Sequence, residues 1–273
     1  MQTLETALKS LWGASRMPFG KAPATLHRWE AFQQAEAQLL RRLSVRAWGM
    51  VHGPNGVGKS QLAAAVADAL PDKQYRVARL THSTLGASDL LRALGHTLEV
   101  KPAFRRADTV AALIRHWQQL DRIHPIILVD EAQNLSSCAL EELRLLSCIG
   151  LDPRPVFSLV LIGDQQLLPR LQMGVQYALR HRLGFQIQLR PMTPAQSREY
   201  VEARLAEVGM RTGPFEDQAL ELLVQAAGGI ARSLNHLAQR SMELAIARST
   251  QRVLTADVQA AIEQLPWLTP EST

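Results

Sequence analysis

Eight consecutive residues carry the clearest chemistry in this chain: Gly53-Pro54-Asn55-Gly56-Val57-Gly58-Lys59-Ser60. They match the pattern G-x-x-x-x-G-K-[ST] in full, after an apolar run of strand length and before an Ala-rich, helix-like run. Glycines let such a loop curl so that its N–H groups point at phosphate oxygens, and the helix N-terminus adds positive partial charge. Lys59 would reach the β- and γ-phosphates of ATP, and Ser60 would ligate Mg²⁺. We therefore predict ATP and Mg²⁺ as cofactors, and we include Gln61 as the next residue of the site. The alternative is a chance match of the motif in a glycine-containing turn, which the strand before it and the helix after it disfavour.

A second group with chemistry follows an apolar run at residues 126–129, where Asp130 and Glu131 stand side by side. The carboxyl ends of strands in open α/β sheets are where ligands bind. Asp130 is expected to hold the magnesium ion, directly or through water, and Glu131 to polarise or orient the attacking water. A polar turn after a strand is the alternative, and the intact phosphate loop upstream weighs against it.

The pattern repeats at residues 160–165, where a buried strand is followed by Gly163, Asp164 and Gln165. If this strand lies beside the acidic one, Asp164 or Gln165 would contact the γ-phosphate or the attacking water. The sequence does not choose between the two side chains, and an ordinary strand-ending turn remains the alternative.

The elements that must position these residues alternate between strand and helix. Expected strands occupy residues 47–52, 76–80, 126–130, 156–162 and 185–189, and expected helices occupy 4–12, 25–43, 61–70, 88–98, 109–122 and 135–149. This alternation indicates a P-loop doubly wound parallel sheet of the α/β class. After residue 193 only helices are expected, at 194–208, 215–227, 231–248 and 255–265. We therefore predict an N-terminal extension at 1–24, an α/β nucleotide-binding domain at 25–190 and a small all-helical lid domain at 191–273.

Composition limits the remaining function classes. The formal net charge is +5 and the pI about 9.6, which is compatible with a polyanionic partner. The spacing of Cys138 and Cys148 fits neither a metal site nor a redox motif, so both are expected to be buried, in a reducing compartment. We find neither a run of about 18 apolar residues nor a signal-peptide pattern, so we expect a cytoplasmic protein without a membrane span. Peripheral membrane association stays open.

The order of these motifs resembles the AAA+ ATPases. It comprises the phosphate loop, D-E-A-Q at 130–133, L-I-G-D-Q-Q-L-L at 161–168, Arg-x-Arg at 180–182 and G-G-x-x-R at 228–232. More narrowly, residues 128–135, 140–147 and 159–167 resemble the ExeA-type branch, which includes secretion-associated ATPases and the ATPase subunits of transposons. The resemblance covers most of residues 28–265, and residues 1–24 match only loosely. It implies that residues 25–190 form an AAA+ core.

The resemblance implies further site residues. Arg180 and Arg182 sit where the family places an arginine finger, offered to a neighbouring subunit to neutralise charge on the γ-phosphate. Arg232 sits where the helical lid supplies its own arginine to the nucleotide, although many relatives have Pro where this chain has Ala231. Gln165 departs from the Asn or Thr of the general AAA+ sensor position. The structural alternative for Arg180 and Arg182 is a solvated basic turn. The alternative for Arg232 is the N-terminus of a surface helix. A finger in trans implies a homo-oligomer, and the choice between ring and helical filament stays open.

Three functions fit these motifs. The first is a DNA-transposition ATPase, which as an ATP-bound oligomer would bind double-stranded DNA non-specifically and recruit or regulate a transposase. Basic clusters at Arg41-Arg42-Arg46 and Lys101-Arg105-Arg106 would contact phosphates, unless they are merely solvated faces. The second is a secretion- or pilus-assembly ATPase, whose relatives usually add a transmembrane segment and a wall-binding domain that we do not find here. The third is a slow P-loop signalling switch, against which the intact Glu131 and Arg182 argue.

Overall fold

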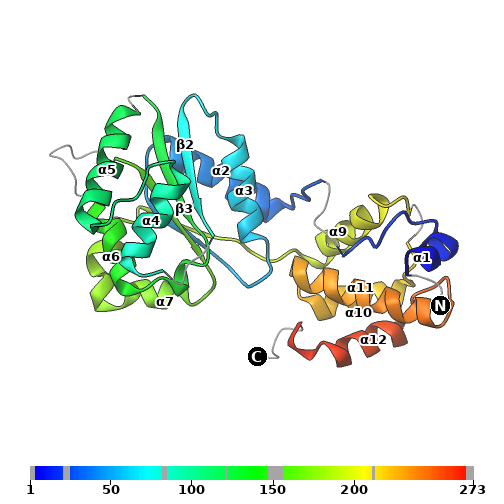
Figure 1. Ribbon diagram of the computed structural model, residues 1–273. Helices are drawn as coiled ribbons and strands as arrows, with labels where there is room; N and C mark the ends of the chain where they lie inside the picture. Colours follow the sequence, from blue (N-terminus) through cyan, green and yellow to red (C-terminus); the bar gives the residue numbers. More distant parts are fainter. Residues whose placement is uncertain are drawn as a thin grey trace. The chain divides into compact units, whose positions relative to one another are not determined.

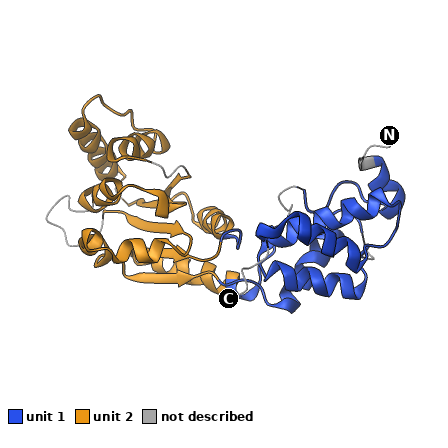
Figure 2. Cartoon of the chain, turned by 90° about the horizontal axis from the view of Figure 1, so that it is seen from below, with its two compact units in different colours: residues 1–31, 55–58, 190–273 blue, residues 32–54, 59–189 orange. Residues whose placement is uncertain are grey.

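The computed structural model describes residues 4–20, 25–81, 85–120, 122–146, 156–210 and 213–268. The chain forms two compact units, coloured separately in Figure 2. Unit 1 comprises residues 1–31, 55–58 and 190–273, and unit 2 comprises residues 32–54 and 59–189. Unit 2 therefore holds the α/β core, and unit 1 joins the N-terminal segment to the C-terminal helices.

Unit 2 is built on a five-stranded parallel sheet (Figure 1). Its strands are β1 (Gly49–His52), β2 (Tyr75–Leu80), β3 (His124–Val129), β4 (Ser158–Gly163) and β5 (Phe185–Gln188). They lie in the order β2-β3-β4-β1-β5. Every residue of β1, β3 and β4 is buried, as continuous apolar strands covered on both faces should be. The order places β1, which precedes the phosphate loop, beside β4, and places β4 beside the acidic strand β3.

Helices cover both faces of this sheet (Figure 1). On one side lie α2 (Glu30–Ser44) and α3 (Lys59–Ala69). On the other lie α4 (Ala87–Thr97), α5 (Arg106–Gln119), α6 (Ser137–Leu146) and α7 (Leu167–Gln172). Leucines of α4, α5 and α6 pack with Trp48, Trp117 and Phe157 into one buried cluster against the strands. The doubly wound α/β fold predicted from the sequence is confirmed.

Unit 1 is helical in its described part. It contains α1 (Leu4–Trp12), α9 (Pro194–Ala206), α10 (Asp217–Ala227), α11 (Ala231–Ala247), α12 (Thr255–Gln264) and the short 3-10 helix η3 (Pro266–Leu268). Thr193 caps α9 with a capping box. The Thr193 hydroxyl accepts from the backbone N–H of Gln196, and the Gln196 side-chain oxygen accepts from the backbone N–H of Thr193. The Trp12 indole donates to the Gln251 carbonyl at 2.7 Å and ties α1 to the loop before α12.

The start of α2 and the burial of Cys138 differ from the prediction. Apolar periodicity predicts a helix from near Thr25, but α2 begins at Glu30. Residues 25–29 are not helical, and the buried Trp29 donates its indole N–H to the carbonyl of Arg190 at 3.2 Å. Cys138 is exposed rather than buried, because it lies in the first turn of α6 and the following Ala139 and Leu140 face the core. Cys148 and the end of the helix expected at 135–149 lie outside the described residues.

Three further short helices join β4 to β5 and were not expected. They are α7, the 3-10 helix η2 (Gly174–Gln176) and α8 (Tyr177–Arg180). A 3-10 turn, η1 (Ala132–Asn134), also stands between β3 and α6. These short helices contain too few residues to show an apolar periodicity, so the sequence pattern did not predict them. No described helix is long and apolar enough to cross a membrane.

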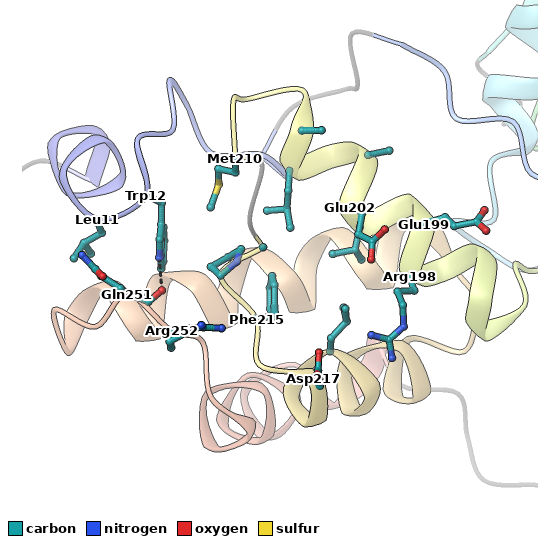
Figure 3. Close-up of a pocket in the computed structure, with 17 residues that line it drawn as sticks. Leu11, Trp12, Arg198, Glu199, Glu202, Met210, Phe215, Asp217, Gln251 and Arg252 are labelled. Atoms are coloured by element: carbon teal, nitrogen blue, oxygen red, sulfur yellow. Dashed lines mark hydrogen bonds between the residues drawn. The ribbon is translucent and has the colours of Figure 1, made fainter.

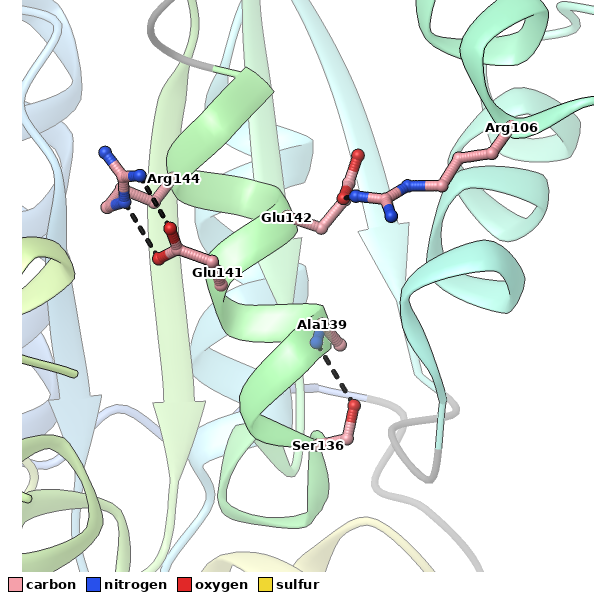
Figure 4. Close-up of polar contacts among 6 residues, drawn as sticks. All are labelled: Arg106, Ser136, Ala139, Glu141, Glu142 and Arg144. Carbon is pink, nitrogen blue, oxygen red and sulfur yellow. Dashed lines mark hydrogen bonds and ion pairs between the residues drawn. The ribbon is translucent and has the colours of Figure 1, made fainter. Parts of the chain in front are cut away.

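An ion pair between a buried carboxylate of α6 and a half-exposed arginine joins α6 to the start of α5 (Figure 4). The Glu142 carboxylate, 3% exposed, accepts a hydrogen bond from the guanidinium of Arg106. A buried carboxylate needs such a partner, because an unpaired charge away from water is costly. One arginine of the expected basic cluster at residues 101–106, itself about half exposed, is therefore engaged in an ion pair. On the outer side of the helix, Glu141 pairs with Arg144.

A second buried polar contact predicts a pH dependence of stability. The imidazole of His124, at the start of β3, bonds to the Ser158 hydroxyl at 2.9 Å. Burial, with a smaller contribution from the charge of Arg46, lowers the pKa of His124 to about 4 from an unfolded value near 6.5. The unfolded chain therefore binds this proton first, so the stability that the neutral imidazole confers is complete above pH 6.5. It is lost as the pH falls towards 4.

We expect His124→Gln, which keeps a hydrogen-bonding group but does not titrate, to reduce this acid sensitivity. The slope removed is at most about 1.4 kcal/mol per pH unit, so moving from pH 7.5 to 5 should cost the wild type about 1–2 kcal/mol more than the variant. Urea unfolding followed by tryptophan fluorescence measures it, because Trp48 and Trp117 lie in the core of the same unit. Equal acid sensitivity in the two proteins would mean that the folded protein carries a charged His124.

Candidate functional site

The phosphate-loop motif has the strand–loop–helix setting that it requires. β1 ends at His52 and α3 begins at Lys59, so residues 53–58 form the connecting loop. Gly56 and Gly58 have φ angles of 82° and 112°, which side-chain-bearing residues rarely adopt. The loop's curvature therefore depends on these two glycines, and the N-terminus of α3 directly follows it. This is the geometry in which backbone N–H groups gather around an anion.

Lys59 is held inside this loop. Its side chain is 5% exposed, and Nζ donates to the carbonyls of Gly53 at 2.9 Å and Pro54 at 3.0 Å. Its charge also acts on His52 at the end of β1, where burial and, to a smaller extent, Lys59 lower the imidazole pKa. The ammonium group is thus fixed in the curl of the loop. Ser60 and Gln61, in the first turn of α3, are exposed.

The tip of the loop contacts the lid arginine that the sequence singled out. Residues 55–58 belong to unit 1, and the N–H of Arg232 donates to the carbonyl of Gly56 at 3.2 Å. A Cβ on Gly56 would come within 2.6 Å of the Arg232 Cβ, so the approach requires glycine. The Arg232 side chain is exposed at the start of α11. Within unit 1, Arg232 therefore contacts Gly56 of the motif.

The two predicted acids follow β3 directly. The N–H of Asp130 donates to the Leu80 carbonyl and continues the sheet, whereas Glu131 turns the chain with a left-handed φ of 52°. The Asp130 Oδ1 accepts the N–H of Glu131 at 3.0 Å. In the sheet, Val129 pairs with Leu161 and His52 pairs with Gly163, so β3, β4 and β1 end at neighbouring positions of one edge. The acids and the start of the phosphate loop therefore share that edge.

Asp164 and Gln165 stand at the same edge, after β4. The Asp164 Oδ1 accepts the N–H of Gln166 at 2.8 Å, which gives this carboxylate a part in starting α7. The Gln165 side chain is exposed. Both residues lie beside the acidic strand end, because β4 pairs with β3 in the sheet.

Sequence reasoning missed the side chain that connects these strand ends, Gln133. Its Nε2 donates to the Glu131 Oε2 at 2.7 Å, and its Oε1 accepts the N–H of Asp164 at 3.3 Å. Arg170 of α7 donates to the carbonyls of Gln133, at 2.6 Å, and Leu135. The D-E-A-Q motif contains Gln133, but no sequence pattern shows that its side chain turns back to Glu131.

Arg180 and Arg182 lie around the end of α8, on a surface shared with α6. The Arg180 guanidinium stacks over the Tyr177 ring at 5.6 Å and donates to the Gln172 carbonyl at 3.3 Å. Arg182 is exposed. The hydrogen bond from Arg144 lowers the pKa of Glu141, and the charge of Arg182 contributes less, so Arg182 acts on α6. Both arginines therefore project from the surface that α6 and α8 share.

A separate cavity of about 1000 Å³ lies within unit 1 (Figure 3). Its walls come from α1, α9, α10 and the loop before α12. Charged groups of both signs line it, including Arg198, Glu202 and Asp217, beside apolar side chains such as Phe215. It contains none of the predicted site residues, so the chemistry of the strand edge in unit 2 does not extend to it.

The residues present fit ATP with a magnesium ion. Mg²⁺ is usually held by one or two carboxylates together with substrate phosphates, rather than by an all-protein cage. Asp130 and the Ser60 hydroxyl would be its protein ligands. Among the described residues, no group of three or more His, Cys, Asp or Glu side chains could hold a metal ion.

Comparison with known proteins identifies the same core. Residues 41–171 match the family model of the AAA domain. General secretion pathway protein A of Aeromonas hydrophila is 26% identical over 270 residues, which cover 96% of this chain and 49% of that protein. Mu-like prophage FluMu DNA transposition protein B of Haemophilus influenzae is 24% identical over 181 residues, which cover 66% of this chain and 60% of that protein. The chain thus spans about half to three fifths of the length of these curated relatives.

A solved structure gives the same fold. Cdc6p from Pyrobaculum aerophilum superposes with a TM-score of 0.71 at 18% identity, covering 90% of this chain and 70% of that chain. At this identity the likeness shows the fold alone. That fold is the P-loop sheet followed by a helical lid that the motifs predicted.

Proposed function

The chain belongs to the AAA+ P-loop ATPases, and we propose that it hydrolyses ATP as an oligomer, binds duplex DNA without sequence preference, and recruits or regulates a transposase. The observation that carries the hydrolytic part is the composition of one sheet edge. A buried Lys59 stands in the phosphate loop, and Asp130 and Glu131 end a strand at the same edge.

The residues have separate roles in the proposed reaction. The loop N–H groups and Lys59 bind and neutralise the phosphates, and Asp130 with Ser60 holds the ion. When bound, Mg²⁺ neutralises charge between the β- and γ-phosphates. Glu131 accepts a hydrogen bond from the attacking water and aims it at the γ-phosphorus. Arg232 would contact the same nucleotide from the lid, and Asp164 or Gln165 would sense its γ-phosphate.

The surface of unit 2 supports an oligomer. Leu145, Val175 and Tyr177 are large apolar side chains that are 42–67% exposed, and they lie on α6, η2 and α8. Exposed apolar side chains gathered beside charged ones mark protein contact surfaces. Arg180 and Arg182 project from this same surface, as a finger offered to a neighbouring copy would require.

The DNA part of the proposal rests on charge and on one relative. Arg41, Arg42 and Arg46, at the end of α2, are all exposed, whereas Arg106 of the other basic cluster pairs with Glu142. The α2 cluster is therefore the better candidate for phosphate contacts. The similarity to a transposition protein B supports a transposase as partner.

A second function has its own support. The similarity to general secretion pathway protein A covers 96% of this chain, more than the similarity to the transposition protein. A role in assembling a secretion apparatus would keep the ATPase core and replace DNA by a cell-envelope partner.

Binding to a random-sequence DNA duplex separates the two functions. We expect a gel shift at low salt with ATP but not with ADP, and rings or filaments on the DNA in negative-stain micrographs. Affinity should fall steeply with salt, because each phosphate contact releases counterions. The double variant Arg41→Gln/Arg42→Gln should weaken binding at least about tenfold and flatten the salt dependence by roughly one unit of slope per lost contact.

The matched control is Arg92→Gln/Arg115→Gln, which removes two exposed arginines of α4 and α5 and should bind like the wild type. Absence of a shift at low salt with ATP would refute the DNA part and favour the secretion function. An equal loss in both double variants would mean that net charge, rather than the α2 cluster, drives binding.

A further inference from the structure

The side-chain amide of Gln133 bridges two strand ends of unit 2. It is 8% exposed, donates to the Glu131 carboxylate at 2.7 Å and accepts the Asp164 N–H at 3.3 Å. A carboxylate only accepts and a backbone N–H only donates, so one orientation of the amide satisfies both partners. The contact therefore specifies which end of Gln133 faces Glu131.

The surroundings fix this amide in place. Gln133 lies in η1, and Arg170 of α7 donates both to the Gln133 carbonyl and to that of Leu135, the residue that follows η1. On its other side is Gly163, where a Cβ would come within 2.6 Å of the Gln133 Oε1 and 2.9 Å of the Leu167 Cδ2. The space that admits the amide thus exists because residue 163 is glycine.

We propose that Gln133 is a positioning residue that orients Glu131 and couples it to the end of β4. This rests on the proposed hydrolytic role of Glu131. The hydrogen bond restricts the carboxylate to one rotamer, and the Asp164 N–H anchors the other end of the amide. A shift of the β4 end, where Asp164 and Gln165 face the proposed nucleotide, moves Gln133 and therefore Glu131. The link conveys the state of the nucleotide to the residue that aims the water.

Kinetics of two Gln133 variants test the positioning. Gln133→Met keeps most of the volume and removes both bonds, and Gln133→Glu keeps the acceptor for Asp164 but places a carboxylate against Glu131. We expect kcat to fall roughly 10–100-fold in both, because misplacing a reacting group by about 1 Å costs about that much. The KM for ATP should stay within about threefold, because Gln133 contributes no group to the phosphate loop.

Two further variants separate positioning from general damage. Gly163→Ala removes no polar group but crowds the amide, so it should reproduce the kcat loss of Gln133→Met. The control is Gln176→Met, because Gln176 is a buried glutamine of η2 whose amide atoms have no hydrogen-bond partner among the described residues. It should leave kcat within about twofold. A loss in Gln176→Met as large as in Gln133→Met would refute the specific role of Gln133.

A double-mutant cycle tests whether Gln133 acts through Glu131. In single-turnover assays, Glu131→Gln should be slow by about 10²–10⁴-fold, and adding Gln133→Met should slow it no further. Additive losses would overturn the proposal.

The contact itself has a readout that does not depend on turnover. The side-chain NH₂ signals of Gln133 in ¹⁵N–¹H spectra, assigned by their loss in Gln133→Met, should shift in Glu131→Ala and in Gly163→Ala. Unmoved signals would refute the bond whether or not the protein hydrolyses ATP. If the signals shift in these two variants but the wild-type protein does not hydrolyse ATP, the hydrogen bond is supported and the proposed hydrolysis is refuted.

Discussion

Lys59→Ala is expected to weaken ATP binding by at least about 100-fold. The ammonium group is held in the curl of the phosphate loop, where it would donate to two phosphates. Each charge-assisted hydrogen bond contributes roughly 1.5–3 kcal/mol, and about 1.4 kcal/mol corresponds to a tenfold change in Kd. Titration calorimetry with ATP, at protein concentrations suited to micromolar Kd values, measures this change.

The control for this prediction is Lys73→Ala, which removes an exposed lysine beyond the end of α3. It should bind ATP like the wild type. Because Lys59 also bonds to the Gly53 and Pro54 carbonyls, thermal unfolding of Lys59→Ala must show an intact fold before its affinity is read. A folded Lys59→Ala protein that still binds ATP at the wild-type Kd would show that this loop is not the phosphate site.

The strand–loop–helix setting of the phosphate-loop motif could be predicted because the motif is contiguous. A contiguous motif brings its glycines, Lys59 and Ser60 together in any strand–loop–helix setting, and the alternation of apolar runs supplied that setting. Asp130 and Glu131 could be placed because a buried strand ends immediately before them, and parallel strands end at one edge of the sheet. In each case a single stretch of chain carries the information.

Contacts between residues far apart in the chain could not be predicted from sequence patterns. Gln133 meets Asp164, 31 residues away, through a space that exists only because residue 163 is glycine. Trp29, just before the late start of α2 at Glu30, donates to the carbonyl of Arg190, 161 residues away. Both depend on tertiary packing, which overrides local propensity. The sequence also could not rank Arg180 against Arg182, because the difference lies in how far the fold buries each side chain.

Arg182→Ala is expected to reduce kcat by about 10³–10⁵-fold, the contribution of an arginine finger to phosphoryl transfer, while ATP affinity stays within about threefold. Arg182 is the better candidate because its side chain is exposed, whereas the Arg180 side chain is half-buried over the Tyr177 ring. Arg180→Ala is therefore the matched variant, and its loss should be much smaller. ATPase assays of both variants, with calorimetry to confirm nucleotide binding, measure the difference.

Mixing variants tests whether the finger acts between copies. Lys59→Ala chains cannot hold ATP but carry an intact Arg182, and Arg182→Ala chains hold ATP without a finger. In an equimolar mixed oligomer with head-to-tail contacts, about one junction in four pairs a filled site with an intact finger, so turnover should recover to roughly that fraction of wild type. Because neither variant alone can form such a junction, recovery requires contact between copies. A mixture no more active than its separate components would assign Arg182 to its own chain's site or to the structure of the α8 turn.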